Sequence, residues 1–194
     1  AVDGAGLVQL DLMDATATTT VDLADADCLM HLAGPSSGME AQADPVKTIS
    51  EGYQITLNTL KLAKRLNVRR VLNASSMVLY GLTAPNPVKE SESLLPVSHY
   101  GVGKLANERL VEIYCKEHAI GFNQMRFFNV YGPGQDLARM GQGLVSIFLA
   151  MLVQNPKVMM KGSPKRFRDI VHIDDVVDVC IKCADSDIED GPLN

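Results

Sequence analysis

Residues 68–76 read Val-Arg-Arg-Val-Leu-Asn-Ala-Ser-Ser, an apolar strand that runs into small polar residues at its end. Apolar residues recur at helical spacing in residues 45–66 before it and in residues 105–118 after it, and the second helix begins near Tyr100. A strand between two such helices is typical of a parallel α/β sheet. In such sheets, ligands bind at the carboxyl ends of the strands, where the small polar residues of this stretch stand.

The alternation of strands and helices continues through the rest of the chain. The spacing predicts further strands at residues 8–12, 28–33, 123–129 and 158–161. It predicts helices at residues 144–153 and 173–184, and loops at residues 34–38 and 85–96. Residues 28–33 are almost wholly apolar, which indicates a strand buried on both faces. The expected fold class is therefore α/β with a parallel sheet.

Composition narrows the class of protein. The chain has 194 residues, of which 46% are hydrophobic and 21% charged, as in ordinary globular proteins. A net charge of -5 gives no reason to expect binding to nucleic acid or to an anionic membrane. Since no apolar run approaches the roughly 20 residues of a membrane span, and no signal segment is present, we expect a cytoplasmic protein.

The chain contains one C-x-x-C pair, Cys180 and Cys183, which in other settings marks a redox pair or half of a zinc site. Here both cysteines lie within a helical pattern, and no second pair of Cys or His follows. We therefore interpret them as small apolar residues that pack a helix. The four histidines are scattered without helical i, i+4 spacing, so no metal site is predicted.

A chemical signal lies at Tyr100 and Lys104, which stand four residues apart on a predicted helix. This spacing places both side chains on one face, where the ammonium can approach the phenol. Because a free tyrosine has a pKa of about 10, it needs such a neighbour to accept a proton near neutral pH. Taken alone, the spacing is also that of an ordinary surface pair.

Three further elements accompany this pair. Ser75 and Ser76 end the strand that precedes it, where a hydroxyl can bind a substrate oxygen or simply form a turn. Residues 126–135 read Arg-Phe-Phe-Asn-Val-Tyr-Gly-Pro-Gly-Gln, and residues 166–175 read Arg-Phe-Arg-Asp-Ile-Val-His-Ile-Asp-Asp. In the last element, Arg168 and Asp169 could instead form an ion pair that caps the final helix.

Together and in this order, the four elements resemble the extended short-chain dehydrogenase/reductases, in particular the NAD-dependent epimerase/dehydratase family and its UDP-glucose (UDP-galactose) 4-epimerases. The resemblance runs from Asp11 to Asn194 and implies a Rossmann-like, doubly wound sheet with NAD as cofactor. It implies catalytic roles for Ser76, Tyr100 and Lys104. It also implies cofactor contacts at Asp11, Leu12, Leu32, Ala33, Gly34, Ala74, Tyr100, Lys104 and Phe128, and substrate contacts at Ser76, Asn129, Leu144, Met159, Lys161 and Arg168.

The resemblance also helps to distinguish epimerisation from the other reactions of the family. Dehydratases and decarboxylases of the family carry an acidic residue at or beside the positions of Met77 and Val78, and related GDP-sugar enzymes carry a cysteine at the first. What remains is epimerisation of a nucleoside-diphosphate sugar, in which Tyr100 accepts the hydroxyl proton and NAD takes the hydride to give a transient keto-sugar. The alternatives are another sugar-nucleotide epimerase or reductase of the family, or an inactive member that binds nucleotide only.

The sequence departs from the family pattern at its start and its end. Gly4-Ala5-Gly6 is not the glycine-rich phosphate loop, because no strand precedes it and no third glycine follows. We therefore expect a chain truncated at both ends, without the first βαβ unit, that binds NAD poorly and is inactive alone. Residues 54–56 read Gln-Ile-Thr where relatives have Asn-x-Gly-Thr, which puts one cofactor contact in doubt.

The expected organisation has three parts. Residues 1–130 are assigned to the NAD-binding domain, residues 131–172 to a substrate-binding segment, and residues 173–194 to a helix that returns to the first domain and the start of the remaining C-terminal part. The resemblance further implies a homodimer formed through the helices at 49–66 and 105–118.

Overall fold

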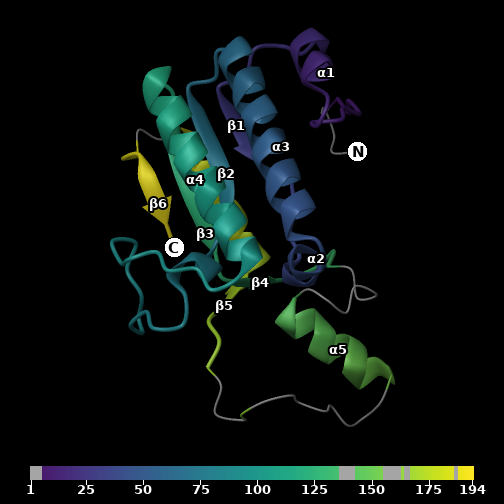
Figure 1. Ribbon diagram of the computed structural model, residues 1–194, viewed down its shortest axis with the longest axis vertical. Coiled ribbons are helices and arrows are strands. Elements are labelled where there is room, and N and C mark those ends of the chain that lie inside the picture. Colours follow the sequence, from purple (N-terminus) through teal and green to yellow (C-terminus); the bar gives the residue numbers. More distant parts are fainter. Residues whose placement is uncertain (1–5, 136–142, 155–162, 164–166, 186–187) are drawn as a thin grey trace.

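A four-stranded parallel sheet forms the centre of the computed structural model of the protein (Figure 1). The structure describes residues 6–135, 143–154, 163, 167–185 and 188–194. The strands, in their order across the sheet, are β1 (Cys28–His31), β2 (Arg70–Ser76), β3 (Gly121–Phe127) and β6 (Gly191–Leu193). This arrangement confirms the predicted α/β class with a parallel sheet.

The register of the sheet brings the ends of its strands together. β2 pairs with β3 over seven residues, from Arg70 opposite Gly121 to Ser76 opposite Phe127. On its other side β2 pairs with β1, with His31 opposite Asn73. Because all strands run in the same direction, their carboxyl ends form one edge, and this is the edge where a parallel sheet binds its ligands.

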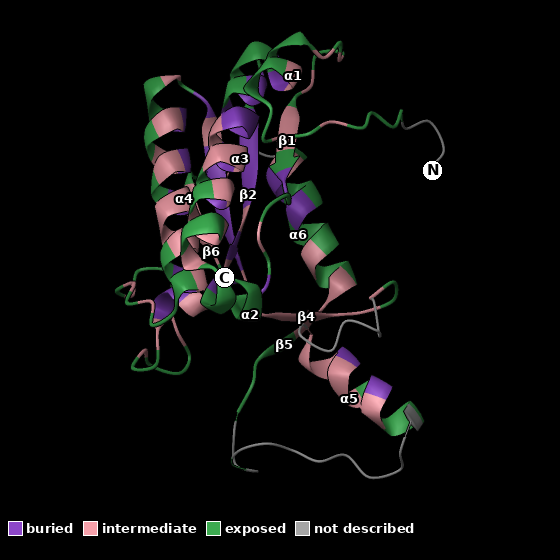
Figure 2. Cartoon of the chain, turned by 45° about the vertical axis from the view of Figure 1, so that its right-hand side comes forward, coloured by how far each residue is buried: buried purple, intermediate pink, exposed green. Residues whose placement is uncertain are grey.

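Helices cover both faces of the sheet, as in the predicted doubly wound arrangement (Figures 1 and 2). On one face lie α3 (Pro45–Arg65) and α4 (His99–Glu117), which pack side by side and bury Val71 of β2 in an apolar cluster. On the other face lies α6 (Ile173–Asp185). There Cys180 and Cys183 pack against Leu72, which confirms the interpretation of the C-x-x-C pair as helix packing.

Capping side chains set where the long helices begin. The Asp44 carboxylate accepts a hydrogen bond from the main-chain N–H of Lys47 and so caps α3, and Ser98 does the same for α4 through the N–H of Gly101 at 3.1 Å. A side chain at Gly101 would crowd Pro96, with only 2.8 Å between the two Cβ atoms. The preceding loop therefore packs tightly against the first turn of α4, which carries Tyr100.

The structure differs from the predictions at the amino-terminal end. Residues 8–12 are not a strand, because the Asp11 and Asp14 carboxylates bind nearby main-chain N–H groups and turn the chain into the short helix α1 (Ala15–Thr20). The predicted loop at 34–38 runs into another short helix, α2 (Gly38–Ala43). Both helices lie beside α3, and neither had been predicted.

Beyond β2 and β3 the chain forms smaller elements. The 3₁₀ turn η1 (Met77–Tyr80) follows β2 directly, and β4 (Asn129–Tyr131) pairs in parallel with β5 (Ile170–His172) as a separate two-stranded sheet. Helix α5 (Leu144–Gln154) confirms the predicted helix at 144–153. The strand predicted at 158–161 lies outside the described residues.

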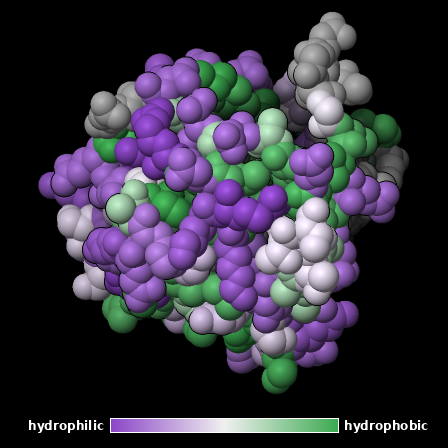
Figure 3. Space-filling model, turned by 90° about the horizontal axis from the view of Figure 1, so that it is seen from above, coloured by the Kyte–Doolittle hydropathy of each residue, from purple (hydrophilic) through white to green (hydrophobic). Residues whose placement is uncertain are grey.

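Burial is greatest along β2 and β3 and on the helix surfaces that face them (Figure 2). The end of the molecule away from the carboxyl edge of the strands carries mainly hydrophilic residues with small hydrophobic groups between them (Figure 3). In the part of the chain that the structure describes, no helix combines the length and the apolar character needed to cross a membrane.

Candidate active site

Ser76, Tyr100 and Lys104 come together at the carboxyl end of β2; we call them the Ser–Tyr–Lys group. The Ser76 hydroxyl acts on the Tyr100 phenol as a hydrogen-bonding neighbour, which by itself lowers the pKa of the phenol. The Lys104 ammonium lies 5.9 Å from the centre of the Tyr100 ring and donates a hydrogen bond to the main-chain oxygen of Ala74 at 2.9 Å. The sequence thus predicted correctly which side chains meet at this edge, although their roles stay a prediction.

Local structure explains how the three side chains meet. Ser76 is the last residue of β2 and is fully extended, and its hydroxyl also lies 3.4 Å from the main-chain N–H of Val78 in η1. Tyr100 and Lys104 occupy successive turns of the same face of α4, whose start is fixed by the Ser98 cap. The group therefore depends on two rigid elements rather than on a loop.

Burial governs the electrostatics of the group. It raises the pKa of Tyr100 above its usual value, while the hydrogen bond from Ser76 acts in the opposite direction. Burial also lowers the pKa of Lys104, and the carboxylate of Glu108 opposes that change. The prediction that Lys104 lowers the pKa of Tyr100 is wrong in its net direction, because desolvation of the phenol outweighs the favourable contacts.

A cavity of about 560 Å³ opens beside the Ser–Tyr–Lys group. Its wall begins at Met77, the residue after Ser76, and includes three of the predicted contact residues, Phe128, Asn129 and Arg168. Ser76, Tyr100 and Lys104 do not themselves line this cavity; Tyr100 and Lys104 line a separate space of only about 10 Å³, too small for a ligand. We therefore take the large cavity as the binding space, with the Ser–Tyr–Lys group at its margin.

The polar residues of the cavity differ in how firmly they are held. Asn129 donates a hydrogen bond to the main-chain oxygen of Asp169 at 2.6 Å, and its amide nitrogen lies 3.9 Å from the sulfur of Met77. Arg168 is exposed, and its guanidinium donates a hydrogen bond to the main-chain oxygen of its neighbour Phe167, at 2.9 Å. Arg168 thus presents a largely accessible guanidinium, which suits recognition of a diphosphate.

The other three predicted substrate contacts, Leu144, Met159 and Lys161, are not among the described residues that line the cavity. Leu144 begins α5, is half-buried and does not line the cavity. Met159 and Lys161 lie outside the described residues. Among the described residues, no cluster of three or more His, Cys, Asp or Glu side chains is arranged to hold a metal ion.

Comparison with known proteins decides the family. The profile described as "NAD dependent epimerase/dehydratase family" matches residues 2–192. The chain belongs to this family. The assignment confirms the resemblance inferred from the sequence, and it confirms NAD as the predicted cofactor.

Curated relatives within the family have more than one printed activity. The chain is 27% identical over 173 residues to a putative UDP-glucose 4-epimerase of Methanocaldococcus jannaschii, covering 89% of this chain and 56% of that protein. It is 32% identical over 177 residues to UDP-glucuronic acid decarboxylase 5 of Arabidopsis thaliana, covering 89% of this chain and 51% of that protein. The chain spans about half the length of these relatives.

Solved structures of the family share the fold closely. A UDP-N-acetylglucosamine 4-epimerase from Methanobrevibacter ruminantium, in complex with UDP-N-acetylmuramic acid, matches with a TM-score of 0.88 at 27% identity over 96% of this chain and 59% of that chain. A UDP-glucose 4-epimerase from Thermotoga maritima with UDP-glucose matches with a TM-score of 0.87 at 25% identity, over 96% of this chain and 60% of that chain.

Three of the residues predicted to contact NAD form an exposed stretch of main chain that a dinucleotide could lie against. Leu32, Ala33 and Gly34 follow β1 at the carboxyl edge and are exposed, and Gly34 has a φ of +124°, with open space where a side chain would stand. Glycine is therefore needed there for its backbone conformation, and the open main chain can be approached closely by a ligand.

The remaining predicted NAD contacts are held by the fold in different ways. Asp11 is exposed in the turn before α1, and the oxygen of Leu12 accepts a hydrogen bond from Asn58 of α3 at 2.8 Å. Ala74 is half-buried, and its oxygen is occupied by Lys104. These positions stay predictions as cofactor contacts.

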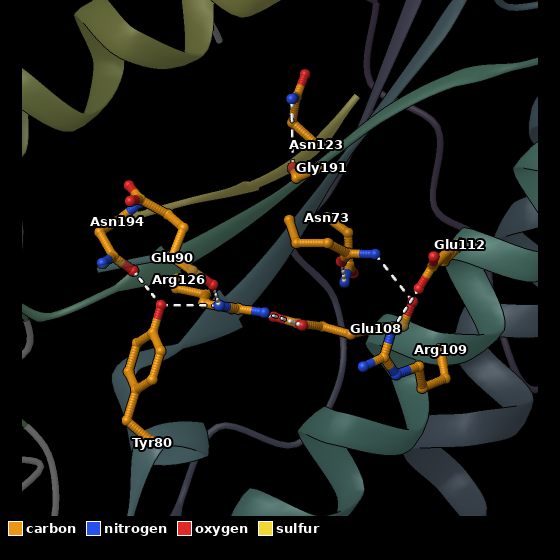
Figure 4. Close-up of polar contacts among 11 residues, drawn as sticks. Asn73, Tyr80, Glu90, Glu108, Arg109, Glu112, Asn123, Arg126, Gly191 and Asn194 are labelled. Carbon is orange, nitrogen blue, oxygen red and sulfur yellow. Dashed lines mark hydrogen bonds and ion pairs between the residues drawn. The ribbon is translucent and has the colours of Figure 1, made fainter. Parts of the chain in front are cut away.

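Sequence reasoning missed a buried polar cluster beside the site, formed by Tyr80, Glu108 and Arg126 (Figure 4). Two signals were available in the sequence. Glu108 stands four residues after Lys104, and Arg126 is a charged residue within an otherwise uncharged strand. What the sequence could not reveal is that these charges meet each other in the interior.

Proposed function

We propose that this protein epimerises a nucleoside-diphosphate sugar of the UDP-glucose/UDP-galactose type, with NAD as the built-in hydride carrier. The observation that carries the proposal is the convergence of Ser76, Tyr100 and Lys104 at the margin of a large cavity. A hydroxyl, a phenol and an ammonium supply the proton transfers that reversible oxidation of a sugar hydroxyl requires.

Each side chain has a distinct task in this reaction. The Ser76 hydroxyl binds the reacting sugar oxygen and Tyr100, so that the phenol lies on the path of the proton. Tyr100 accepts the hydroxyl proton and returns it when the alcohol re-forms. Lys104 stabilises the negative charge that the phenolate carries before it accepts this proton and again after it has returned it. NAD, when bound, would supply the hydride acceptor and donor for the sugar carbon, and Lys104 and Gly34 are among the residues that would hold it.

The cavity supplies the binding groups. Arg168 and Asn129 are placed to hold the diphosphate, the first through its exposed guanidinium and the second through an amide fixed by Asp169. Apolar side chains, among them Met77 and Phe128, form much of the remaining wall. A keto-sugar held mainly by its diphosphate can turn within such a space and present its other face.

Decarboxylation of a UDP-sugar acid is the second candidate, because the Arabidopsis relative at 32% identity is named for that reaction. Two residues speak against decarboxylation: Met77 and Val78 directly follow Ser76, and neither side chain can transfer a proton. An elimination or decarboxylation needs an additional acid or base near the sugar. We therefore favour epimerisation.

The proposal extends to assembly and location. α3 and α4 expose large apolar side chains, including Tyr53, Val102 and Ile113, which supports a homodimer formed through these two helices. A second copy of the chain is the partner that we propose for them. The cytoplasmic location predicted from the sequence stays a prediction.

The test is interconversion of UDP-glucose and UDP-galactose by the protein expressed from its complete reading frame with NAD. Tyr100→Phe removes the phenolic hydroxyl and is expected to lower turnover about 10²- to 10⁴-fold. Tyr114→Phe, the same change at the far end of α4, is the matched control and should retain activity. Conversion of UDP-glucuronate to a pentose without any epimerisation would favour the second candidate. NAD binding without turnover of any UDP-sugar would favour an inactive binder.

A further inference from the structure

A buried ion pair fastens α4 to the sheet one turn beyond Lys104. The guanidinium of Arg126 donates two parallel hydrogen bonds to the Glu108 carboxylate, from Nε to Oε1 at 3.0 Å and from Nη2 to Oε2 at 2.9 Å. The two side chains are only 5% and 6% exposed. This forked geometry leaves little freedom to either partner.

The same guanidinium also binds Tyr80, whose side chain lines the cavity (Figure 4). Its Nη1 donates to the Tyr80 hydroxyl at 2.7 Å and to the main-chain oxygen of Glu90 at 3.1 Å. The Tyr80 hydroxyl in turn donates to the Asn194 side chain at 2.6 Å, and both Tyr80 and Asn194 line the cavity. The ion pair therefore links the catalytic helix to η1, to the following loop and to the end of β6.

The main chain of α4 is fixed at the same point. The oxygen of Glu108 accepts a hydrogen bond from the Gln124 amide at 2.9 Å, and Gln124 accepts one from Asn73 at 2.7 Å. One turn earlier, Lys104 binds the oxygen of Ala74. Residues 100, 104 and 108 thus form one stripe along α4, and the last two are tied to β2 and β3 by polar contacts.

Such a pair is an inefficient way to stabilise a fold. Removing two charges from water costs much of what their attraction returns, so a well-packed apolar pair of similar volume is often as stable. The position of this pair, one helical turn from Lys104, points to a different purpose.

We propose that Glu108, held in place by Arg126, is a positioning residue for the proposed reaction: the ion pair fixes the stretch of α4 that carries Tyr100 and Lys104, and the Glu108 carboxylate places a negative charge one helical turn from Lys104. The inference rests on the proposed function, because it assigns a purpose to a residue that touches neither substrate nor NAD. Glu108 acts through Lys104, and Arg126 acts through Glu108.

The charges around Lys104 can be named from each neighbouring element. Tyr100 and Glu108 lie on α4 itself, His31 lies at the end of β1, and Arg126 lies on β3. Burial lowers the pKa of His31 to about 4, and Lys104 acts in the same direction, so the imidazole is neutral at neutral pH. Glu108 is then the negative charge that opposes the effect of burial on the pKa of Lys104.

Glu108→Gln tests the inference, because it removes the charge and keeps the shape. We expect the pKa of Lys104 to fall, measured by ¹³C NMR of its ε carbon in the protein from its complete reading frame, with Lys104→Met to assign the signal. Turnover should fall about 10- to 100-fold, with KM for the UDP-sugar unchanged. Glu108→Asp, which retains the charge, should restore the pKa of Lys104 in part.

Glu112→Gln is the matched control. Glu112 lies one turn further along α4 and pairs with Arg109 at 2.6 Å and with Lys116 at 2.8 Å on the exposed surface. It undergoes the same chemical change and should alter neither the pKa of Lys104 nor turnover. An effect equal to that of Glu108→Gln would overturn the inference, because a general change of charge on α4 would then explain both.

A second variant covers the case in which Glu108→Gln does not fold with Arg126 left unpaired. In Glu108→Gln/Arg126→Gln both buried charges are absent, and we expect a folded protein with the same loss of turnover. Wild-type turnover and a wild-type pKa for Lys104 in this double variant would overturn the inference. If Glu108→Gln shifts the pKa of Lys104 while the wild-type protein turns over no UDP-sugar, the proposed function is refuted and the effect of Glu108 on Lys104 stands.

Discussion

The Lys104 ammonium donates a hydrogen bond to the main-chain oxygen of Ala74, 2.9 Å away, and so joins the middle of α4 to the end of β2. This contact places a charged group in a site where burial lowers its pKa. Ala74 lies two residues before Ser76, so the same contact also sets the distance between the lysine and the serine along the edge of the sheet. The arrangement is costly for stability and useful for proton transfer.

Lys104→Met is expected to separate the effect of the buried ammonium on stability from its effect on proton transfer. The substitution keeps an apolar stem of similar length and removes both the charge and the bond to Ala74. We expect turnover to fall about 10²- to 10⁴-fold, because the phenolate loses its cation. The free energy of unfolding should stay within about 1 kcal/mol of wild type, because relief of the buried charge offsets the lost hydrogen bond.

The measurement pairs UDP-sugar turnover with urea unfolding of the same preparations. Lys116→Met is the control, since Lys116 lies on the same helix with an exposed side chain. It should change neither quantity by much. Turnover retained in Lys104→Met would contradict the role given to the ammonium.

Gly81→Ala is expected to destabilise the loop that leads to Tyr100. Gly81 has a φ of +73°, and a side chain there would run into the main-chain oxygen of Leu95. With ψ at −155°, this backbone conformation is one that essentially only glycine adopts, which alone costs an alanine about 1–3 kcal/mol, and the clash adds to it, so we expect a loss of more than about 2 kcal/mol in the free energy of unfolding.

Gly134→Ala provides the comparison, because Gly134 has a similar φ of +85° and open space around it. It should cost only the backbone term, about 1 kcal/mol. Urea unfolding of both variants at one pH gives the difference directly. Equal losses would show that the close packing of Gly81 against Leu95 contributes nothing.

The sequence was sufficient for the elements with a strong apolar period. Strands β1, β2 and β3 and helices α3, α4 and α6 lie close to where periodicity put them. The predicted strand at 8–12 failed because the Asp11 and Asp14 carboxylates satisfy local main-chain N–H groups, which favours a turn over pairing in a sheet. The spacing of apolar residues does not reveal that side-chain hydrogen bonds compete with strand pairing.

Some residues of the candidate site could likewise be predicted from the sequence, and others could not. Ser76, Tyr100 and Lys104 could be brought together from sequence, because strand ends and helical spacing fix them by short-range rules. The Glu108–Arg126 pair could not, since it depends on how α4 lies across β3. The direction of the pKa of Tyr100 was missed for the same reason: the extent of burial is a property of packing and not of spacing.

His31 is expected to make the fold sensitive to acid. Its Nε2 lies 3.1 Å from the hydroxyl of Thr56, and that hydroxyl donates to the oxygen of Gly52 at 2.8 Å. The hydroxyl therefore accepts from His31, so the ring carries its hydrogen on Nε2. Protonating the ring would place a second charge in a buried site near Lys104, and burial lowers the pKa of His31 from 6.5 to about 4.

The consequence is a loss of stability between pH 6.5 and about 4. In that interval the unfolded chain binds a proton at His31 that the folded chain does not, so the free energy of unfolding falls as the pH falls. The total loss is about 3 kcal/mol, at about 1.4 kcal/mol for each pH unit of the shift. Above pH 6.5 the imidazole is neutral in both states and contributes no pH dependence.

His31→Gln should remove this dependence while keeping a donor for Thr56, because the glutamine amide can take the place of the Nε2–H group. Urea unfolding of both proteins at a series of pH values from 7.5 to 4.5 makes the comparison, and every other titrating group cancels in the difference. We expect the stability of the wild type relative to His31→Gln to decline steadily below pH 6.5. A difference that stays constant across the series would mean that His31 binds a proton as readily in the folded protein as in the unfolded chain, so that its burial does not lower its pKa.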